Sequence, residues 1–238
     1  MNVAIINQTI RAMCLDVEAH GSSSCDWRLL TEDQLLYEAA ICIFGSQILF
    51  EMAVATADRL QELGLIRSGL RGMSAEDFER RVADALSDPL PMIDGKGRMQ
   101  WVRPRFKNRL ASLLTSTVVE VYEGSRSIKS LLCVGGNAKD TRKLLTRHIW
   151  GFGPKQASLF LRRVGYCEDL AVLDVHVLDY LRLARGMSLP PSQLGRLAFY
   201  EKVEDAFREV ALDFGHTLGC VDLATWLTMR VAKREALL

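Results

Sequence analysis

Apolar residues recur at three- and four-residue spacing along nearly the whole chain of 238 residues, and strand-like alternation is almost absent. This period keeps one face of an α-helix in a core. Glycine, proline and serine interrupt it, as where Gly45 divides one long stretch. The sequence therefore predicts an all-α protein with helices near residues 2–19, 32–63, 74–86, 104–122, 137–150, 154–164, 174–185, 196–213 and 217–233.

Size and composition limit the class of protein. With 49% hydrophobic and 25% charged residues, a chain of this length can bury a core without disulfides. Apolar runs such as 39–44 are much shorter than the roughly 20 residues that a membrane span needs. The first residues lack the basic start and long apolar stretch of a secretory signal. We therefore expect a cytoplasmic protein without a membrane partner.

The six cysteines show no metal-binding pattern at short range. No C-x-x-C pair is present, and no histidine stands at zinc-ligand spacing from a cysteine. Cys42 and Cys133 lie within apolar helical runs, which favours buried thiols. The expectation is a protein with no metal site formed by these cysteines.

Charge is distributed unevenly along the chain although the net charge is only +1. Residues 1–95 hold 7 basic and 15 acidic residues (−8), residues 96–163 hold 15 and 3 (+12), and residues 164–238 hold 8 and 11 (−3). The excess in the middle third indicates a polyanion-binding surface. A solvated helical face with ion pairs to the acidic N-terminal third is the alternative.

The stretch 144–161 has the pattern of two helices joined by a glycine hairpin. Gly151 and Gly153 permit a tight turn and a close backbone approach, and Pro154 suits the first position of a helix. Exposed N–H groups there, together with the positive end of the second helix dipole, favour a phosphate oxygen. The stretch resembles a helix-hairpin-helix motif, and this resemblance implies a hairpin that contacts DNA backbone without reading base sequence.

The residues around this hairpin resemble a known family. Gly-x-Gly-x-Lys-x-Ala at 151–157, basic residues ending the next helix, and Asp174-x-His176 are similar to the bifunctional helix-hairpin-helix DNA glycosylases. The closest resemblance is to the type 2 8-oxoguanine DNA glycosylase/AP lyases, and it extends roughly from residue 35 to residue 226. It implies an all-α, two-lobed fold with a cleft between the lobes. We expect one lobe at 45–165, ending in the hairpin motif, and a second formed by 1–44 plus 166–238.

The same resemblance implies that Lys155 is the nucleophile and Asp174 its essential partner. Chain geometry permits their meeting: a helix over 154–164 is about 16 Å long, and residues 166–173 can reach back as far as about 27 Å when extended. Alternatively, Lys155 is a solvated lysine on a DNA-touching helix. Asp174 can also cap the next helix, and this role is compatible with catalysis.

Nucleophilic chemistry requires these residue types. An ordinary lysine has a pKa near 10.4, so a nucleophilic one needs an environment that favours the free amine. Because an ionised aspartate has the opposite effect, we assign Asp174 to stabilising the cationic sugar of the transition state and orienting attack at C1′. The resulting Schiff base acidifies the C2′ proton, and β-elimination then cleaves the strand.

Other positions are expected at the DNA or the extruded base. The resemblance implies that His176 binds a phosphate, that Gln47 fills the gap left by the base, and that Trp226 stacks on it. Their alternatives are a helix-surface histidine, a polar residue at a helix start and a core tryptophan. We also expect backbone contacts from Gly151, Gly153, Arg103 and Arg142, and core or hairpin positions for Trp101, Trp150, Phe152 and Phe160.

The sequence departs from the family pattern at Gln156, Phe160 and Val175, so backbone chemistry is better matched than base recognition. The reading is a bifunctional DNA glycosylase/AP lyase for 8-oxoguanine in base excision repair, acting as a nucleoid-associated monomer on damaged double-stranded DNA. The alternatives are a diverged glycosylase for another modified base, as in foreign DNA, and a non-catalytic DNA-binding protein. No cofactor is required, although carbonyls at 150–153 are candidates for a structural monovalent cation.

Overall fold

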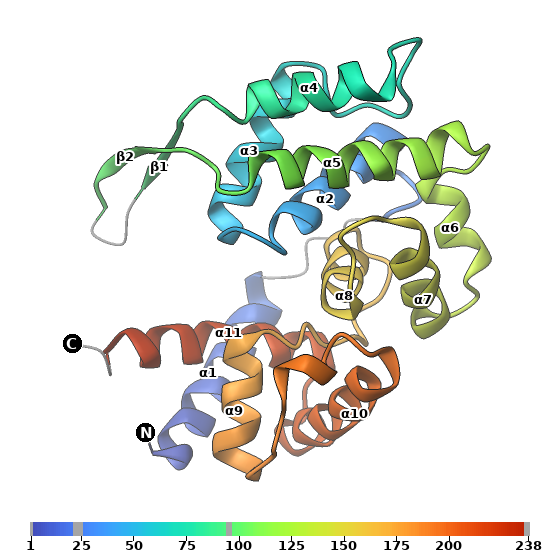
Figure 1. Cartoon of the computed structure of the whole chain (residues 1–238). Helices are drawn as coiled ribbons and strands as arrows, with labels where there is room; N and C mark the ends of the chain where they lie inside the picture. The colour runs from blue at the N-terminus through green and yellow to red at the C-terminus, as the bar shows by residue number, and fades with distance from the viewer. Residues whose placement is uncertain (1, 21–25, 94–96, 236–238) are drawn as a thin grey trace. The chain divides into compact units, whose positions relative to one another are not determined.

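The computed structural model describes residues 2–20, 26–93 and 97–235 (Figure 1). The chain divides into two compact units, one of Trp27–Phe160 and the other of Met1–Asp26 with Leu161–Leu238. The expected lobes had their first boundary at residues 44 and 45, whereas the compact units place it at residues 26 and 27. Residues 27–44 therefore pack with the middle of the chain.

The unit Trp27–Phe160 is built mainly of helices. They are α2 (Glu32–Phe44), α3 (Phe50–Glu62), α4 (Ala75–Ala85), α5 (Lys107–Val118), α6 (Ile128–Val134), α7 (Ala138–His148) and most of α8 (Pro154–Arg163), with a π-helical segment at Val119–Glu123. α3 packs on α2, and α4 packs along α5 (Figure 1). The all-α prediction is confirmed for most of this unit, while α6 was not expected.

Local sequence explains why α2 begins and ends where it does. The Thr31 hydroxyl accepts the Gln34 N–H at 3.2 Å, and the Gln34 side chain accepts the Thr31 N–H at 2.8 Å. This reciprocal capping box satisfies two backbone donors. Gly45 ends the helix. Because residues 39–44 are buried all round, α2 is a central helix of its unit.

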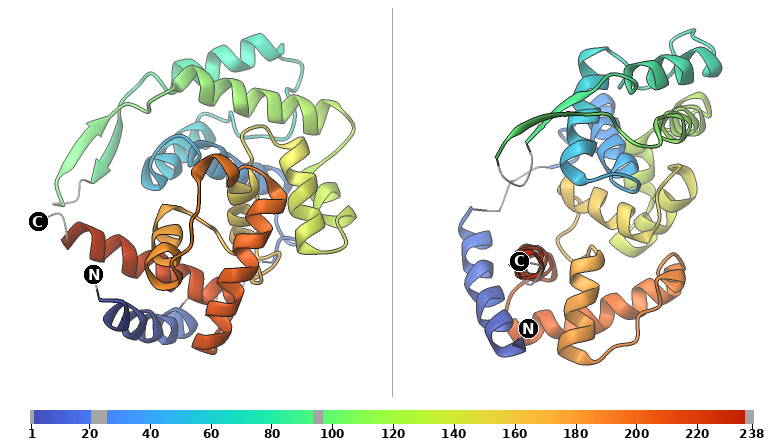
Figure 2. Two further views of the ribbon diagram at one scale, coloured as in Figure 1. Left: turned by 60° about the horizontal axis from the view of Figure 1, so that its bottom comes forward. Right: turned by 60° about the vertical axis from the view of Figure 1, so that its left-hand side comes forward.

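A small antiparallel hairpin, β1 (Leu90–Ile93) with β2 (Met99–Val102), was not predicted. Pro91 pairs with Trp101 and Ile93 with Met99. Strands of four residues are too short to show a reliable period. Trp101 is 68% exposed, so of the two positions expected for it, core or hairpin, the core position was wrong. The hairpin projects from the helices of its unit (Figures 1 and 2).

The other unit joins the two ends of the chain. It contains α1 (Val3–His20), α9 (Val175–Arg185), a 3-10 turn at Pro191–Gln193, α10 (Leu197–Phe214) and α11 (Leu218–Glu235). α1 lies along α11 (Figure 2). Its core includes Ile10, Tyr200 and Phe207, with Tyr180 packed edge-on against Phe207. Helices α1 and α11, about 200 residues apart in the sequence, are thus in direct contact.

The cysteines match the expectation only in part. Cys14, Cys42 and Cys220 are buried, whereas Cys133 is exposed and Cys167 half-buried. Burial raises the pKa of the Cys14 thiol to about 12. Among the helices described, not one combines the length and apolar character required to cross a bilayer.

Arg142 does not lie on the surface that was expected to meet DNA. It belongs to the buried face of α7 with Thr141 and Leu145, is fully buried, and donates to the Ser158 hydroxyl at 3.1 Å. The expected phosphate contact from Arg142 is therefore wrong, because its helical position three residues before Leu145 turns it inward.

We expect Arg142→Ala to lower the free energy of unfolding by about 1–3 kcal/mol, because the buried Ser158 hydroxyl loses its donor. Urea denaturation followed by circular dichroism measures this change. The matched control is Lys143→Ala, whose side chain is exposed on the same helix, and which should change stability by less than about 0.5 kcal/mol. Equal losses in the two variants would contradict the buried role of Arg142.

Candidate nucleic-acid interface and active site

The turn between α7 and α8 requires glycine at its first position. Gly151 has φ +87°, and a Cβ there would lie 3.3 Å from Leu113 Cδ1 and 3.4 Å from Ile43 Cγ2. Both the backbone conformation and the close packing therefore disfavour any side chain. The Thr117 hydroxyl fixes the turn by accepting the Trp150 N–H at 3.1 Å. The sequence prediction of a glycine hairpin between two helices is confirmed.

The hairpin presents backbone donors that have no internal partner. Within the described residues of this unit, the N–H groups of Gly151 and Gly153 donate to no acceptor. They precede the N-terminus of α8, where the helix dipole is positive. This combination is suited to a phosphate oxygen. The carbonyl oxygens of the same turn are ligands of a kind that suits a monovalent cation. Cation binding at this turn stays a prediction.

Aromatic residues around the turn divide between core and surface. Phe152 and Phe160 are buried, with ring centroids 5.7 Å apart, as expected for core residues. Trp150 lies in the turn and is 56% exposed. Phe160, one of the departures from the family pattern, therefore fills core space beneath the hairpin.

Lys155 is the second residue of α8. Its side chain is half-buried. It forms no hydrogen bond or ion pair within the described part of its own unit. The amine is thus held at a helix N-terminus without an acidic neighbour from that unit to occupy it, and it remains available to an electrophile.

Basic side chains line exposed faces of the same unit. On α7, Lys139, Lys143 and Arg147 are exposed at four-residue intervals and form one stripe. Arg103, expected at the DNA, is exposed just after β2. These positions support the polyanion-binding surface predicted from charge.

Gln47 lies between α2 and α3 rather than at a helix start. It is half-buried, and its side-chain amide donates to the Ser46 hydroxyl at 3.2 Å. Its backbone N–H donates to the Phe44 carbonyl at 2.9 Å. The short turn thus fixes the backbone of Gln47. Its insertion into DNA stays a prediction.

In the other unit, three polar groups hold the extended segment before α9. The Tyr200 hydroxyl donates to the Ala171 carbonyl at 2.8 Å and accepts the Leu173 N–H at 3.1 Å. The buried Glu204 carboxylate accepts the Ala171 N–H at 3.0 Å. A non-helical segment inside a helical unit needs such partners because its buried backbone groups would otherwise be unsatisfied.

Asp222 is the third of these groups. One carboxylate oxygen accepts the Val172 N–H at 3.0 Å, and the other receives Arg162 at 2.5 Å. Arg162 also donates to the Gly219 carbonyl at 2.8 Å. Burial raises the pKa of Asp222 to about 6, and the Arg162 guanidinium acts against this rise.

Gly219 is required where this network meets α11. A Cβ at Gly219 would lie 2.7 Å from the Glu168 carbonyl oxygen and 3.3 Å from Arg162 Nε. Sequence reasoning missed Asp222, Tyr200 and Glu204. For Asp222 and Glu204 a signal was available, because each is an acidic residue at a helical position where the apolar period predicts a core residue.

Asp174 is the N-cap of α9. Its Oδ1 accepts the His176 N–H at 2.8 Å and the Val177 N–H at 3.1 Å. Within the described residues of its unit, Oδ2 has no hydrogen-bond partner. The cap interpretation is therefore confirmed, and it leaves one carboxylate oxygen available for another role.

His176 and Trp226 are brought together in this unit. Their rings meet edge-on with centroids 6.4 Å apart, and Arg230 lies over the Trp226 ring at 4.8 Å. Burial lowers the pKa of His176, and the neighbouring Asp174 opposes this effect. Trp226 is half-buried against the core, so part of its ring surface is already covered. Base stacking by Trp226 stays a prediction.

Lys155 and Asp174 belong to different units, Trp27–Phe160 and the one containing Leu161–Leu238. Asp174 is fixed by its two hydrogen bonds to the first turn of α9, and Lys155 is placed by its position in the first turn of α8. Their meeting at one reacting carbon, expected from the resemblance, stays a prediction.

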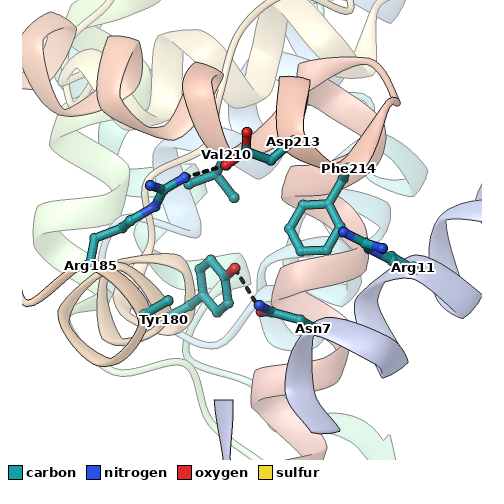
Figure 3. Close-up of a pocket in the computed structure, with 8 residues that line it drawn as sticks. Asn7, Arg11, Tyr180, Arg185, Val210, Asp213 and Phe214 are labelled. Carbon is teal, nitrogen blue, oxygen red and sulfur yellow. Dashed lines mark hydrogen bonds and ion pairs between the residues drawn. The ribbon is translucent and has the colours of Figure 1, made fainter. Parts of the chain in front are cut away.

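A pocket of about 370 Å³ lies between α1, α9 and α10 and contains none of the expected site residues (Figure 3). Its polar groups are paired with one another. Tyr180 donates to Asn7 at 2.9 Å, Arg185 contacts Asp213 at 2.6 Å, and Arg11 lies over the Phe214 ring at 5.3 Å. These pairings leave the pocket without a free reactive group from this set, so we do not assign the DNA chemistry to it.

Comparisons with known proteins agree with the fold and the hairpin motif described above. The chain is similar to curated 8-oxoguanine DNA glycosylase/AP lyases, including one from Aquifex aeolicus that is 32% identical over 133 residues, 54% of this chain and 58% of that protein. One from Thermoplasma volcanium is 38% identical over 90 residues, 38% of this chain and 42% of that protein. The chain thus spans about half the length of the curated relatives it matches.

Solved structures show the same fold. The 8-oxoguanine DNA glycosylase of Methanocaldococcus jannaschii matches with a TM-score of 0.66 at 21% identity, over 94% of this chain and 91% of that one. Its complex with a 15mer DNA containing 8-oxoguanine matches with a TM-score of 0.61 at 21% identity, over 94% and 88% of the two chains.

A family model described as 8-oxoguanine DNA glycosylase matches residues 96–216, which is 121 of the 238 residues. This match contains the basic stripe, the glycine hairpin, Lys155, Asp174 and the buried anchors Tyr200 and Glu204. The chain therefore belongs to the 8-oxoguanine DNA glycosylase family with a helix-hairpin-helix motif.

Proposed function

We propose that this protein is a bifunctional DNA glycosylase that removes 8-oxoguanine from duplex DNA and cleaves the strand at the resulting abasic site. The observation that carries the proposal is the position of Lys155 directly after the glycine hairpin. Among the described residues of its unit, the amine of Lys155 and the hairpin N–H groups have no hydrogen-bond partner. Membership of the family supports the choice of substrate. Binding to DNA alone would need the hairpin but no such lysine.

Backbone binding comes from the unit Trp27–Phe160. The free N–H groups of Gly151 and Gly153 suit one phosphate, and the α7 stripe supplies positive charge for neighbouring phosphates. Such contacts fix the position of the duplex without reading its sequence. Excision also requires the damaged base to leave the stack, because C1′ is not accessible to a nucleophile within the duplex.

Lys155 then supplies the nucleophile. Its ammonium loses a proton, and the amine nitrogen forms a bond to C1′ as the glycosidic bond breaks and the departing base takes up a proton. Opening of the sugar gives a Schiff base. Loss of the C2′ proton expels the 3′ phosphate, and water finally releases Lys155 from the cleaved strand.

Asp174 stabilises the positive charge that develops on the sugar. Its Oδ1 is fixed by two N–H groups of α9, which holds the carboxylate orientation before substrate arrives. The partner-free Oδ2 is the atom that we assign to this role. A preorganised charge aimed at a developing cation lowers the barrier without reorganisation during the reaction. Action as a monomer in the cytoplasm remains part of the proposal.

The experiment that tests the proposal is covalent trapping. Duplex DNA with 8-oxoguanine opposite cytosine, incubated with the protein and borohydride, should give a protein–DNA adduct because reduction makes the Schiff base permanent. Lys155→Gln should abolish the adduct, while Lys202→Ala, at an exposed lysine of α10, serves as a matched control that retains it. Denaturing gel electrophoresis measures both the adduct and strand cleavage.

The same assay distinguishes the proposed activity from the alternative functions. An adduct with an abasic site but none with 8-oxoguanine would keep the lysine chemistry and reject the proposed base, as expected of a glycosylase for another modified base. Binding without any adduct would favour a non-catalytic DNA-binding protein.

We expect Asp174→Asn to lower the single-turnover rate of base release by about 10²–10³-fold, the cost of losing one preorganised transition-state contact. Asparagine caps helices as well as aspartate does, so the α9 cap and DNA affinity should be retained. Rapid-quench kinetics and circular dichroism measure the two effects. Wild-type rates in this variant would remove Asp174 from the chemistry.

DNA affinity should fall steeply as salt concentration rises, because phosphate contacts release counterions. Arg103→Ala should weaken binding similarly on every sequence and reduce the slope of log affinity against log salt by about 1. Fluorescence anisotropy over a salt series measures this slope. An unchanged slope would place Arg103 outside the DNA contact.

A further inference from the structure

Four side chains with metal-binding atoms meet where α1 packs beside the start of α11. Cys14 and Glu18 stand four residues apart on α1 and therefore share one face of that helix. His216 and Cys220 are also four residues apart, on either side of the first residue of α11, Leu218. The Thr217 hydroxyl accepts the Cys220 N–H at 3.3 Å and fixes this turn.

The donor atoms lie close together. Those of Glu18, His216 and Cys220 are all within 4.8 Å of one another. Glu18 Oε1 and His216 Nδ1 are 2.7 Å apart. The Cys220 thiol donates to the Cys14 carbonyl at 3.5 Å. One imidazole, one carboxylate and one thiol thus face a single point, and Cys14 stands one turn of α1 before Glu18.

The chemistry of this set selects the kind of ion. Thiolate and imidazole ligands favour zinc over magnesium or calcium, and structural zinc takes four ligands in a tetrahedron. Metal–ligand bonds of zinc imply donor separations of roughly 3.3–3.8 Å. The Glu18–His216 pair, at 2.7 Å, therefore has to separate by about 0.6–1.1 Å to bind one zinc ion.

The four side chains differ in exposure, with the two thiols inside and the carboxylate at the surface, as a closed metal site requires. Cys14 is fully buried and Cys220 nearly so, whereas the side chains of His216 and Glu18 are 15% and 47% exposed. An ion can therefore enter from the Glu18 side and reach the thiols behind it.

We propose that Glu18, His216 and Cys220 form a structural zinc site that ties the N-terminal helix α1 to α11, with the neighbouring Cys14 thiol turning toward the ion as the fourth ligand. The site is independent of the proposed DNA chemistry, since none of these residues has a part in it. The expectation of no metal site overlooked the four-residue spacing of His216 and Cys220. It also could not foresee Glu18, which lies about 200 residues away in sequence.

Zinc titration of the full chain tests the proposal. The protein is stripped with a chelator, kept reduced with a phosphine, and titrated with Zn²⁺ alone against a chromophoric competitor. We expect one zinc per chain, a raised melting temperature, and a thiolate-to-metal charge-transfer band when Co²⁺ replaces Zn²⁺. Less than stoichiometric uptake, or a Co²⁺ spectrum without that band, would overturn the proposal.

Variants show which residues hold the ion. Cys220→Ser should weaken zinc binding at least about 100-fold, because even second-shell changes cost 10–100-fold. Glu18→Gln, at the exposed side, keeps the packing of α1 and should also weaken binding, so the test stands if Cys220→Ser fails to fold. The matched control is Cys133→Ser, an exposed cysteine of the other unit, which should bind as wild type. Wild-type affinity in Glu18→Gln together with Cys220→Ser would assign the ion elsewhere.

Discussion

The segment that leads to Asp174 depends on one buried carboxylate. Asp222 accepts the Val172 N–H and pairs with Arg162, so one residue of α11 joins the end of α8 to the extended segment before α9. Burying a charge is costly unless it is paired and hydrogen-bonded, and both oxygens of Asp222 are satisfied. Removing either partner would leave a buried charge or amide without compensation. This constraint explains why a non-helical segment keeps one course through a helical unit.

The proposed site separates holding DNA from reacting with it. Backbone amides of the glycine hairpin and exposed basic side chains suit phosphates, which are the same in every sequence. Lys155 and Asp174 have different requirements, since each needs one polar atom free of internal partners. The structure leaves the Lys155 amine and Asp174 Oδ2 in that condition within their own units. A helix N-cap thereby fixes the direction of a carboxylate while sparing one of its oxygens.

Much of the fold followed from helical period and punctuation. The break at Gly45 and the turn at Gly151 are local features, so sequence reasoning located them. The errors also have physical reasons. Arg142 was assigned to DNA by its charge, but its position relative to Leu145 places it on the buried face of α7. The four-residue strands and the exposed Trp101 carried too short a pattern to be recognised.

The sequence by itself determined the helices, the glycine hairpin, and the lysine and aspartate that resemble those of the family, because these depend on neighbours within a few residues. Only the tertiary structure decided which charged groups are buried anchors and which are free. It paired Asp222 with Arg162 and brought Cys14 beside Cys220. Such contacts join helices that are distant along the chain, and their free energy depends on burial and on partners that local spacing does not specify.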